Sequence, residues 1–123
     1  VNQVKSKHAQ QTERTRILLA LMIHYPELYD EFGESLGMLN IVDAAYDEVR
    51  QALINLLTEQ NNLDYQTVKQ HLTESGYGKA LEAIFDRSLY LHAGFAKPGQ
   101  PLEAVRQAWQ DIWETGFVNV RSA

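Results

Sequence analysis

Apolar side chains recur every three or four positions along most of this chain, which is the spacing of an amphipathic helix. Alternation of apolar and polar residues, which is typical of a strand, is confined to the short stretch 117–120. The spacing predicts helices over residues 12–24, 44–60, 79–92 and 101–115, with two more opening at Pro26 and after Asp64. Because none can bury its apolar stripe alone, we expect an all-α fold, a compact bundle of about six short helices.

Capping residues and helix breakers mark the expected boundaries. Thr12 and Asp64 are suited to cap helix starts, because their side-chain oxygens can accept hydrogen bonds from free backbone N–H groups. Pro26 disfavours helix at Tyr25, so the first helix is expected to end at residue 24. Gly116 is expected to end the last helix in the left-handed conformation, which glycine adopts at little cost.

The composition excludes several classes of protein. The 123 residues include 45% hydrophobic and 22% charged side chains, proportions typical of one globular domain. The absence of cysteine rules out disulfide bridges, thiolate zinc sites and a cysteine nucleophile. The longest apolar run, residues 17–23, is far shorter than the roughly 20 residues of a membrane span. No signal-peptide pattern follows Val1, so we expect part of a longer cytoplasmic protein with no membrane partner.

Charge is distributed unevenly along the chain. Residues 1–16 carry four basic side chains and one acidic one, whereas residues 17–123 carry seven basic and fifteen acidic ones. An acidic body repels phosphate and is therefore a poor binder of DNA or RNA. We interpret the polar, basic segment 1–11 as a solvated linker that contacts nucleic acid at most weakly.

The histidines do not form a metal-binding motif, because no two of the four lie three or four positions apart. His24 and His92 fall near expected helix ends, where the helix dipole stabilises an imidazolium, and His71 is expected at the surface. Residues 75–79, SGYGK, superficially resemble a phosphate-binding loop. They lack the preceding strand and the hydroxyl residue after the lysine, so they indicate a helix-breaking turn.

Acidic residues cluster in the second expected helix, at Glu27, Asp30, Glu31 and Glu34. Paired carboxylates can act as acids and bases or hold magnesium when they face a pocket. Here the opposite side of the helix is apolar, which indicates a solvated acidic face suited to a basic partner. We therefore predict no catalytic, cofactor-binding or metal-binding residue and no small-molecule substrate, while an enzyme or ligand site assembled from separated helices stays an alternative.

The aromatic residues near the end of the chain allow two interpretations. Trp109 and Trp113 lie four positions apart on one helix face, as core residues or as anchors for a partner protein. Phe117 and Val118 follow, and such an apolar end either folds back on the bundle or contacts another molecule. The spacing does not choose between these interpretations.

Four stretches form a pattern that covers most of residues 12–114. They read RILLALMIHYPEL at 16–28, RQALINLL at 50–57, HLTESG at 71–76 and VRQAW at 105–109. This pattern resembles the C-terminal domain of bacterial DNA primase, and the last stretch looks like its alphaproteobacterial versions. The most distinctive positions are His24, Pro26, Leu28 and Trp109.

The resemblance implies a non-catalytic helical bundle that docks onto the replicative DNA helicase and so recruits and regulates primer synthesis at the replication fork. In that family the nucleotidyltransferase core, with its magnesium, and a zinc-binding domain lie elsewhere in the protein. Residues 1–11 would then be a linker from the primase core, 12–115 the bundle and 116–123 a tail. Trp113, Phe117 and Val118 become the candidate partner-binding residues.

Two features qualify this assignment. The family continues beyond the bundle into a terminal helical hairpin that makes the main helicase contact, whereas here the tail is at most the start of one. The N-terminal oligomerisation domain of the replicative helicase itself has a similar fold and a similar sequence pattern in its first helices. The basic segment before the bundle and Trp109 favour the primase domain over that alternative.

Overall fold

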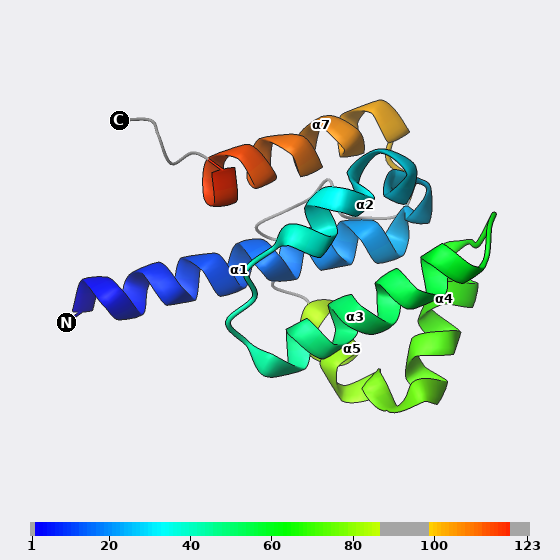
Figure 1. Cartoon of the computed structure of the whole chain (residues 1–123), viewed down its shortest axis with the longest axis horizontal. Coiled ribbons are helices and arrows are strands. Elements are labelled where there is room, and N and C mark those ends of the chain that lie inside the picture. The colour runs from blue at the N-terminus through cyan, green and yellow to red at the C-terminus, as the bar shows by residue number, and fades with distance from the viewer. Residues whose placement is uncertain (1, 87–98, 119–123) are drawn as a thin grey trace.

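The chain folds as helices packed around one central helix (Figure 1). The computed structural model describes the backbone of residues 2–86 and 99–118, and the side chains of residues 10–86 and 99–117. Within these ranges there is no strand, so the prediction of an all-α domain is confirmed. The elements are α1 (Asn2–His24), η1 (Pro26–Leu28), α2 (Tyr29–Met38), α3 (Ala44–Glu59), α4 (Tyr65–Leu72), η2 (Thr73–Tyr77), α5 (Gly78–Ile84), α7 (Leu102–Trp113) and η4 (Glu114–Val118).

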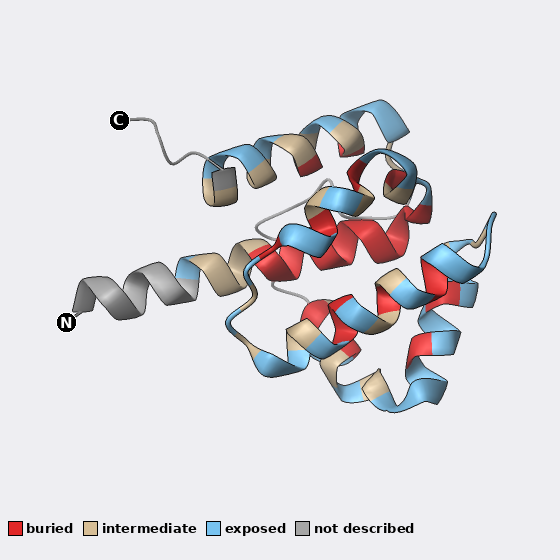
Figure 2. Cartoon of the chain, in the orientation of Figure 1, coloured by how far each residue is buried: buried red, intermediate tan, exposed pale blue. Residues whose placement is uncertain are grey.

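Helix α1 is the centre of the hydrophobic core. Its residues 18–23 are fully buried, and Ile17 is nearly so. Helix α7 packs along one side of α1, while α3, α4 and α5 pack on the other (Figures 1 and 2). The expectation that each helix has one apolar stripe is therefore wrong for α1. A helix that is apolar all round is stable only where neighbours enclose it, which explains the uninterrupted apolar run.

Aspartate side chains cap two of the helices, Asp43 at α3 and Asp64 at α4, and the cap at Asp64 was predicted. The carboxylate of Asp43 accepts a hydrogen bond from the backbone N–H of Tyr46 at the start of α3, at 3.1 Å. Asp64 accepts one from the backbone N–H of Thr67 at the start of α4, at 2.9 Å. Helix α1 ends one residue before Tyr25, whose φ of −129° and ψ of 72° leave the helical region ahead of proline.

Two predicted boundaries are wrong. Helix α1 begins at Asn2, so Thr12 lies inside the helix and does not cap it, and most of the segment interpreted as a linker is helical. Helix α5 ends at Ile84, where the expected helix ran on to residue 92. Residues 87–98, which include His92, lie outside the described residues. The assignment of 1–11 to a connection between domains stays a prediction.

The helix-breaking turn predicted within residues 75–79 is confirmed at Gly76 only. Gly76 has a φ of +100°, in the left-handed region where a side chain would be strained. Helix α5 restarts at Gly78, so this second glycine begins a helix where a break was expected. The two π-helical segments differ. Segment η2 contains the kink at Gly76, whereas η4 continues α7 with no residue of positive φ.

Candidate protein-interaction groove

A ladder of aromatic rings leads from the core to the surface along α7. Phe32 of α2 stacks on Trp109 with ring centres 4.7 Å apart. Trp109 is followed by Trp113 at 6.3 Å, and Trp113 by Phe117 at 5.9 Å, with interplanar angles of 29° and 18°. Phe32 and Trp109 are buried, whereas Trp113 and Phe117 are half-buried. The ladder thus holds the outer two rings in fixed orientations.

The inner end of the ladder belongs to the core. Trp109 is fully buried, and its indole N–H donates a hydrogen bond to the carbonyl of Leu18 in α1, at 3.1 Å. A buried tryptophan N–H normally finds such a partner. Trp109 is therefore a core residue. Trp113 is half-buried, so part of its ring is exposed and accessible to a partner protein.

The outer end of the ladder lines a surface groove of about 300 Å³. Met38, at the end of α2, forms the facing wall and is 70% exposed, and Val42 in the following connection is 57% exposed. Polar groups without formal charge complete the lining, which consists of Gln11, Met38, Asn40, Trp113, Thr115, Gly116 and Phe117. We call this hollow the C-terminal groove.

Two of the three predicted partner-binding residues line this groove. Trp113 and Phe117 both line it, and the structure therefore brings these two together. Val118 is the last residue of η4, and its side chain lies outside the described residues. Met38 was missed by sequence reasoning. Its position six residues after the buried Phe32, at the end of an amphipathic helix, gives no signal that it lies opposite Trp113.

Gly116 is a correction to the sequence prediction. It does not adopt a positive φ, and the chain continues helically through it to Val118. Glycine is needed for another reason, since a Cβ at this position would lie 2.5 Å from Cδ of Arg14 in α1. The aliphatic part of Arg14 therefore packs directly against the η4 backbone and fixes one end of the C-terminal groove.

A second hollow, of about 510 Å³, lies where α1, α2 and the α3–α4 connection meet. Tyrosine rings, side-chain amides and three exposed carboxylates line it, and its residues are His24, Tyr25, Pro26, Glu27, Tyr29, Asp30, Leu57, Gln60, Asn61, Asn62, Leu63, Asp64 and Tyr65. The backbone N–H of Thr67 lowers the pKa of Asp64, because it stabilises the carboxylate. The hydroxyl of Tyr25 accepts a hydrogen bond from the backbone N–H of Gln100, at 3.0 Å.

His24 lines this second hollow as a neutral ring. The centre of its ring lies 4.1 Å from that of Tyr65, with the two planes tilted by 30°, and it meets Phe85 edge-on at 4.9 Å. Burial, with a smaller contribution from the charge of Lys69, lowers the pKa of His24 to about 4. The predicted position at the end of α1 is right, but the expected imidazolium interacting with the helix dipole is wrong, because the ring is uncharged near neutral pH.

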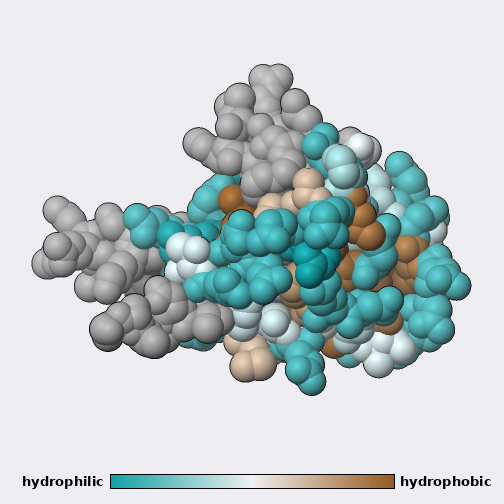
Figure 3. All heavy atoms as spheres, turned by 90° about the horizontal axis from the view of Figure 1, so that it is seen from above, coloured by the Kyte–Doolittle hydropathy of each residue, from teal (hydrophilic) through white to brown (hydrophobic). Residues whose placement is uncertain are grey.

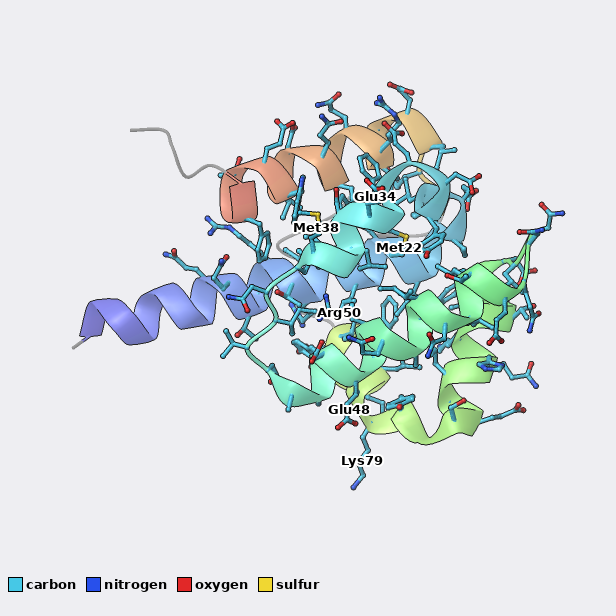
Figure 4. All side chains as sticks on the ribbon, viewed as in Figure 1. Met22, Glu34, Met38, Glu48, Arg50 and Lys79 are labelled. Carbon is cyan, nitrogen blue, oxygen red and sulfur yellow. The ribbon has the colours of Figure 1, made fainter. Side chains whose placement is uncertain are left out.

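The two buried arginines, Arg16 and Arg50, were not foreseen from the sequence. Arg50 is 7% exposed and donates hydrogen bonds to the carbonyls of Leu36, Gly37 and Leu39 at the end of α2, at 3.1, 3.2 and 2.9 Å. It also pairs with Asp47, and Figure 4 shows Arg50 reaching from α3 towards α2. Its place on the apolar stripe, one turn before Leu53, was the available signal.

The acidic residues of η1 and α2 are solvent-exposed, as predicted. Glu31 forms an ion pair with Arg106 of α7 at 2.7 Å, and Arg106 also contacts Glu103 at 3.3 Å. His71 is exposed, as expected. In the described part of the chain no three histidines, aspartates or glutamates come together as a metal site would require.

No helix in residues 2–86 and 99–118 combines the length and apolar character that crossing a membrane requires. Comparisons of the sequence with protein-family models, with curated proteins and with solved structures find no match. The geometry of the C-terminal groove and the pattern of the sequence are therefore the grounds on which a function can be argued.

Proposed function

We propose that this chain is a non-catalytic interaction domain of a bacterial DNA primase, which docks onto the replicative DNA helicase. The proposal rests on one observation. The rings of Trp113 and Phe117 stack on each other, are half-buried, and lie in the C-terminal groove together with the exposed Met38. Aromatic residues anchored by a rigid neighbour are typical of the few positions that dominate binding between proteins. The sequence resemblance to the primase domain supplies the identity of the partner.

The residues that contribute most to the resemblance have structural roles in this fold. His24 is buried at the end of α1, and Leu28 is buried in η1. Pro26 opens η1, and Trp109 joins α7 to α1 through its hydrogen bond to Leu18. A shared pattern at such positions supports a shared core, and therefore a bundle of the primase type.

Docking would act by raising the local concentration of primase at the fork. Once the domain is bound, a catalytic core tethered to it meets its template by an intramolecular encounter, which can strengthen the productive interaction without any new contact. Rigid aromatic rings favour such docking because little side-chain entropy is lost when the partner binds. The chemistry of primer synthesis would belong to the other domains of the parent protein.

The direct test is calorimetric titration of the domain with the cognate replicative helicase. A longer chain that includes the helical hairpin expected after the bundle is titrated in parallel. We expect heat of binding with the longer chain and weaker binding with the 123 residues alone. The absence of binding by both chains would overturn the proposal.

Light scattering separates the proposal from the alternative assignment. A primase interaction domain is expected to be monomeric on dilution, because its partner is another protein. An oligomer that survives dilution would instead favour the N-terminal oligomerisation domain of the replicative helicase, and it would overturn the primase assignment.

A further inference from the structure

Two of the elements that line the C-terminal groove, α2 and α7 with its continuation η4, carry an excess of negative charge. Helix α2 contains three carboxylates and no basic residue, and α7 with η4 contains three carboxylates and one arginine. That arginine, Arg106, is held by Glu31 and Glu103. Within the described residues, Glu34 and Glu114 lie within ion-pair distance of no basic side chain. Seen from the α7 side, the surface is mostly hydrophilic, with small apolar areas between the polar ones (Figure 3).

Glu34 and Glu114 lie close in the sequence to apolar residues of the groove. Glu34 precedes Met38 by one helical turn on α2, and both are exposed, so they share one face of that helix. They project from α2 on the side where α7 lies (Figure 4). Glu114 directly follows Trp113 and is also exposed, and Gln110 holds its carboxylate at 2.9 Å. The apolar residues of the groove thus have an exposed carboxylate beside them on both α2 and η4.

We propose that the C-terminal groove seats an amphipathic helix whose apolar stripe is bordered by lysine or arginine. This inference deepens the proposed function and rests on it, since it describes the element of the helicase that would meet Met38, Trp113 and Phe117. A helix laid into an apolar groove presents side chains at every third or fourth position, which matches the spacing of Trp113 and Phe117. Its basic edges would face Glu34 and Glu114.

Charge complementarity argues for a separate basic partner and against a second copy of this chain. In a symmetric dimer each groove would meet the same surface of the other copy, so acidic edges would face acidic edges. Like charges placed opposite each other across an interface oppose association. A basic helix removes that repulsion. On the α1 side, Arg14 packs against Gly116, so the partner is expected to carry its positive charge away from that end.

The test uses two synthetic helical peptides of about 18 residues, long enough to hold a helix in solution. Both have the same leucine stripe, and one has lysine on its edges where the other has glutamate. We expect the lysine peptide to bind more tightly and to shift the NMR signals of the Met38 methyl and the Trp113 indole. Reversing charge with the double variant Glu34→Lys/Glu114→Lys should weaken lysine-peptide binding about three- to tenfold and favour the glutamate peptide.

A matched control makes the same charge change elsewhere. Glu59→Lys/Glu82→Lys alters exposed residues of α3 and α5, and lysine-peptide affinity should be nearly unchanged in moderate salt. Equal affinity for the two peptides, shifts away from the groove, or a dimer that forms through the groove would overturn the inference. If the helicase binds and the double reversal leaves that binding unchanged, this inference fails while the proposed function stands. If only the peptide binds, the proposed function fails instead.

Discussion

The indole N–H of Trp109 donates a hydrogen bond to the carbonyl of Leu18, a residue 91 positions earlier in the sequence, and so joins α7 to α1. Leu18 is itself fully buried in the central helix. The hydrogen bond therefore helps to set the position and rotation of α7 against α1. Because Trp113 and Phe117 stack in turn on Trp109, it also helps to orient these two half-exposed rings.

Removing this anchor should destabilise the whole fold. Trp109→Ala leaves a large cavity beside Phe32 and removes the hydrogen bond to Leu18, so the free energy of unfolding should fall by about 3–5 kcal/mol. Urea denaturation followed by circular dichroism measures the change. Trp113→Ala is the comparison, and because Trp113 is half-exposed its cost should be clearly smaller. Equal costs would contradict the order of burial along the ladder.

Arg50 should contribute to stability through the end of α2. Arg50→Met keeps the length of the side chain but leaves three backbone carbonyls without their charged donor. The free energy of unfolding should fall by about 2–4 kcal/mol. Arg106→Met is the matched control, because Arg106 forms exposed ion pairs that contribute about 0–1 kcal/mol. Chemical denaturation of both variants compares the two arginines.

Burial of His24 makes stability depend on pH. Its pKa is lowered to about 4 in the fold from an ordinary 6.5. Between pH 6.5 and 4 the unfolded chain binds the proton more readily than the folded chain, so the free energy of unfolding falls as the pH falls through this range. Above pH 6.5 the contribution of the neutral ring to stability is fully present. The total loss is at most about 3 kcal/mol. Denaturation midpoints measured from pH 7 to 4 check the slope.

Two variants assign that slope to His24. His24→Phe keeps an aromatic ring against Tyr65 and Phe85 but cannot take up a proton, so the loss between pH 6.5 and 4 should become shallower. His71→Gln changes an exposed histidine and should leave the slope as it is. A slope that survives in His24→Phe would show that other groups cause it.

Local signals predicted the boundaries that depend on neighbours in the sequence. Asp64 and Pro26 act within one helical turn, and the structure places a helix boundary beside each of them as expected. The beginning of α1 at Asn2 was not predicted, because polar residues without apolar spacing resemble a linker. Lysine, glutamine and alanine nevertheless have good helix propensity, so composition alone did not exclude a helix there.

Features that depend on distant residues could not be predicted from spacing. His24 is neutral because Tyr65 and Phe85 enclose it, and neither is near it in the sequence. The groove was only half predicted. Trp113 and Phe117 share a helical stripe, which the sequence reveals, but the opposing wall at Met38 depends on how α2 packs against α7.

The contact between Gly116 and Arg14 can be tested with a double-mutant cycle. Gly116→Ala should gain up to about 1 kcal/mol from helix propensity, but the new Cβ must displace the Arg14 side chain. In an Arg14→Ala background that obstruction is gone, and the full gain should appear. The free energies of unfolding of the four proteins should therefore show a coupling of about 0.5–1 kcal/mol. Additive effects would contradict direct packing of Arg14 on η4.

The outer ring of the ladder should matter for binding more than for folding. Phe117→Asp places a charge in the C-terminal groove and should weaken helicase binding at least about tenfold, while Phe117 is only half-buried and the bundle should stay folded. Leu102→Asp is the matched control, because Leu102 is 45% exposed at the opposite end of α7. Calorimetry measures affinity, and circular dichroism verifies folding. Normal binding by Phe117→Asp, or equal weakening by Leu102→Asp, would place the helicase contact outside the groove.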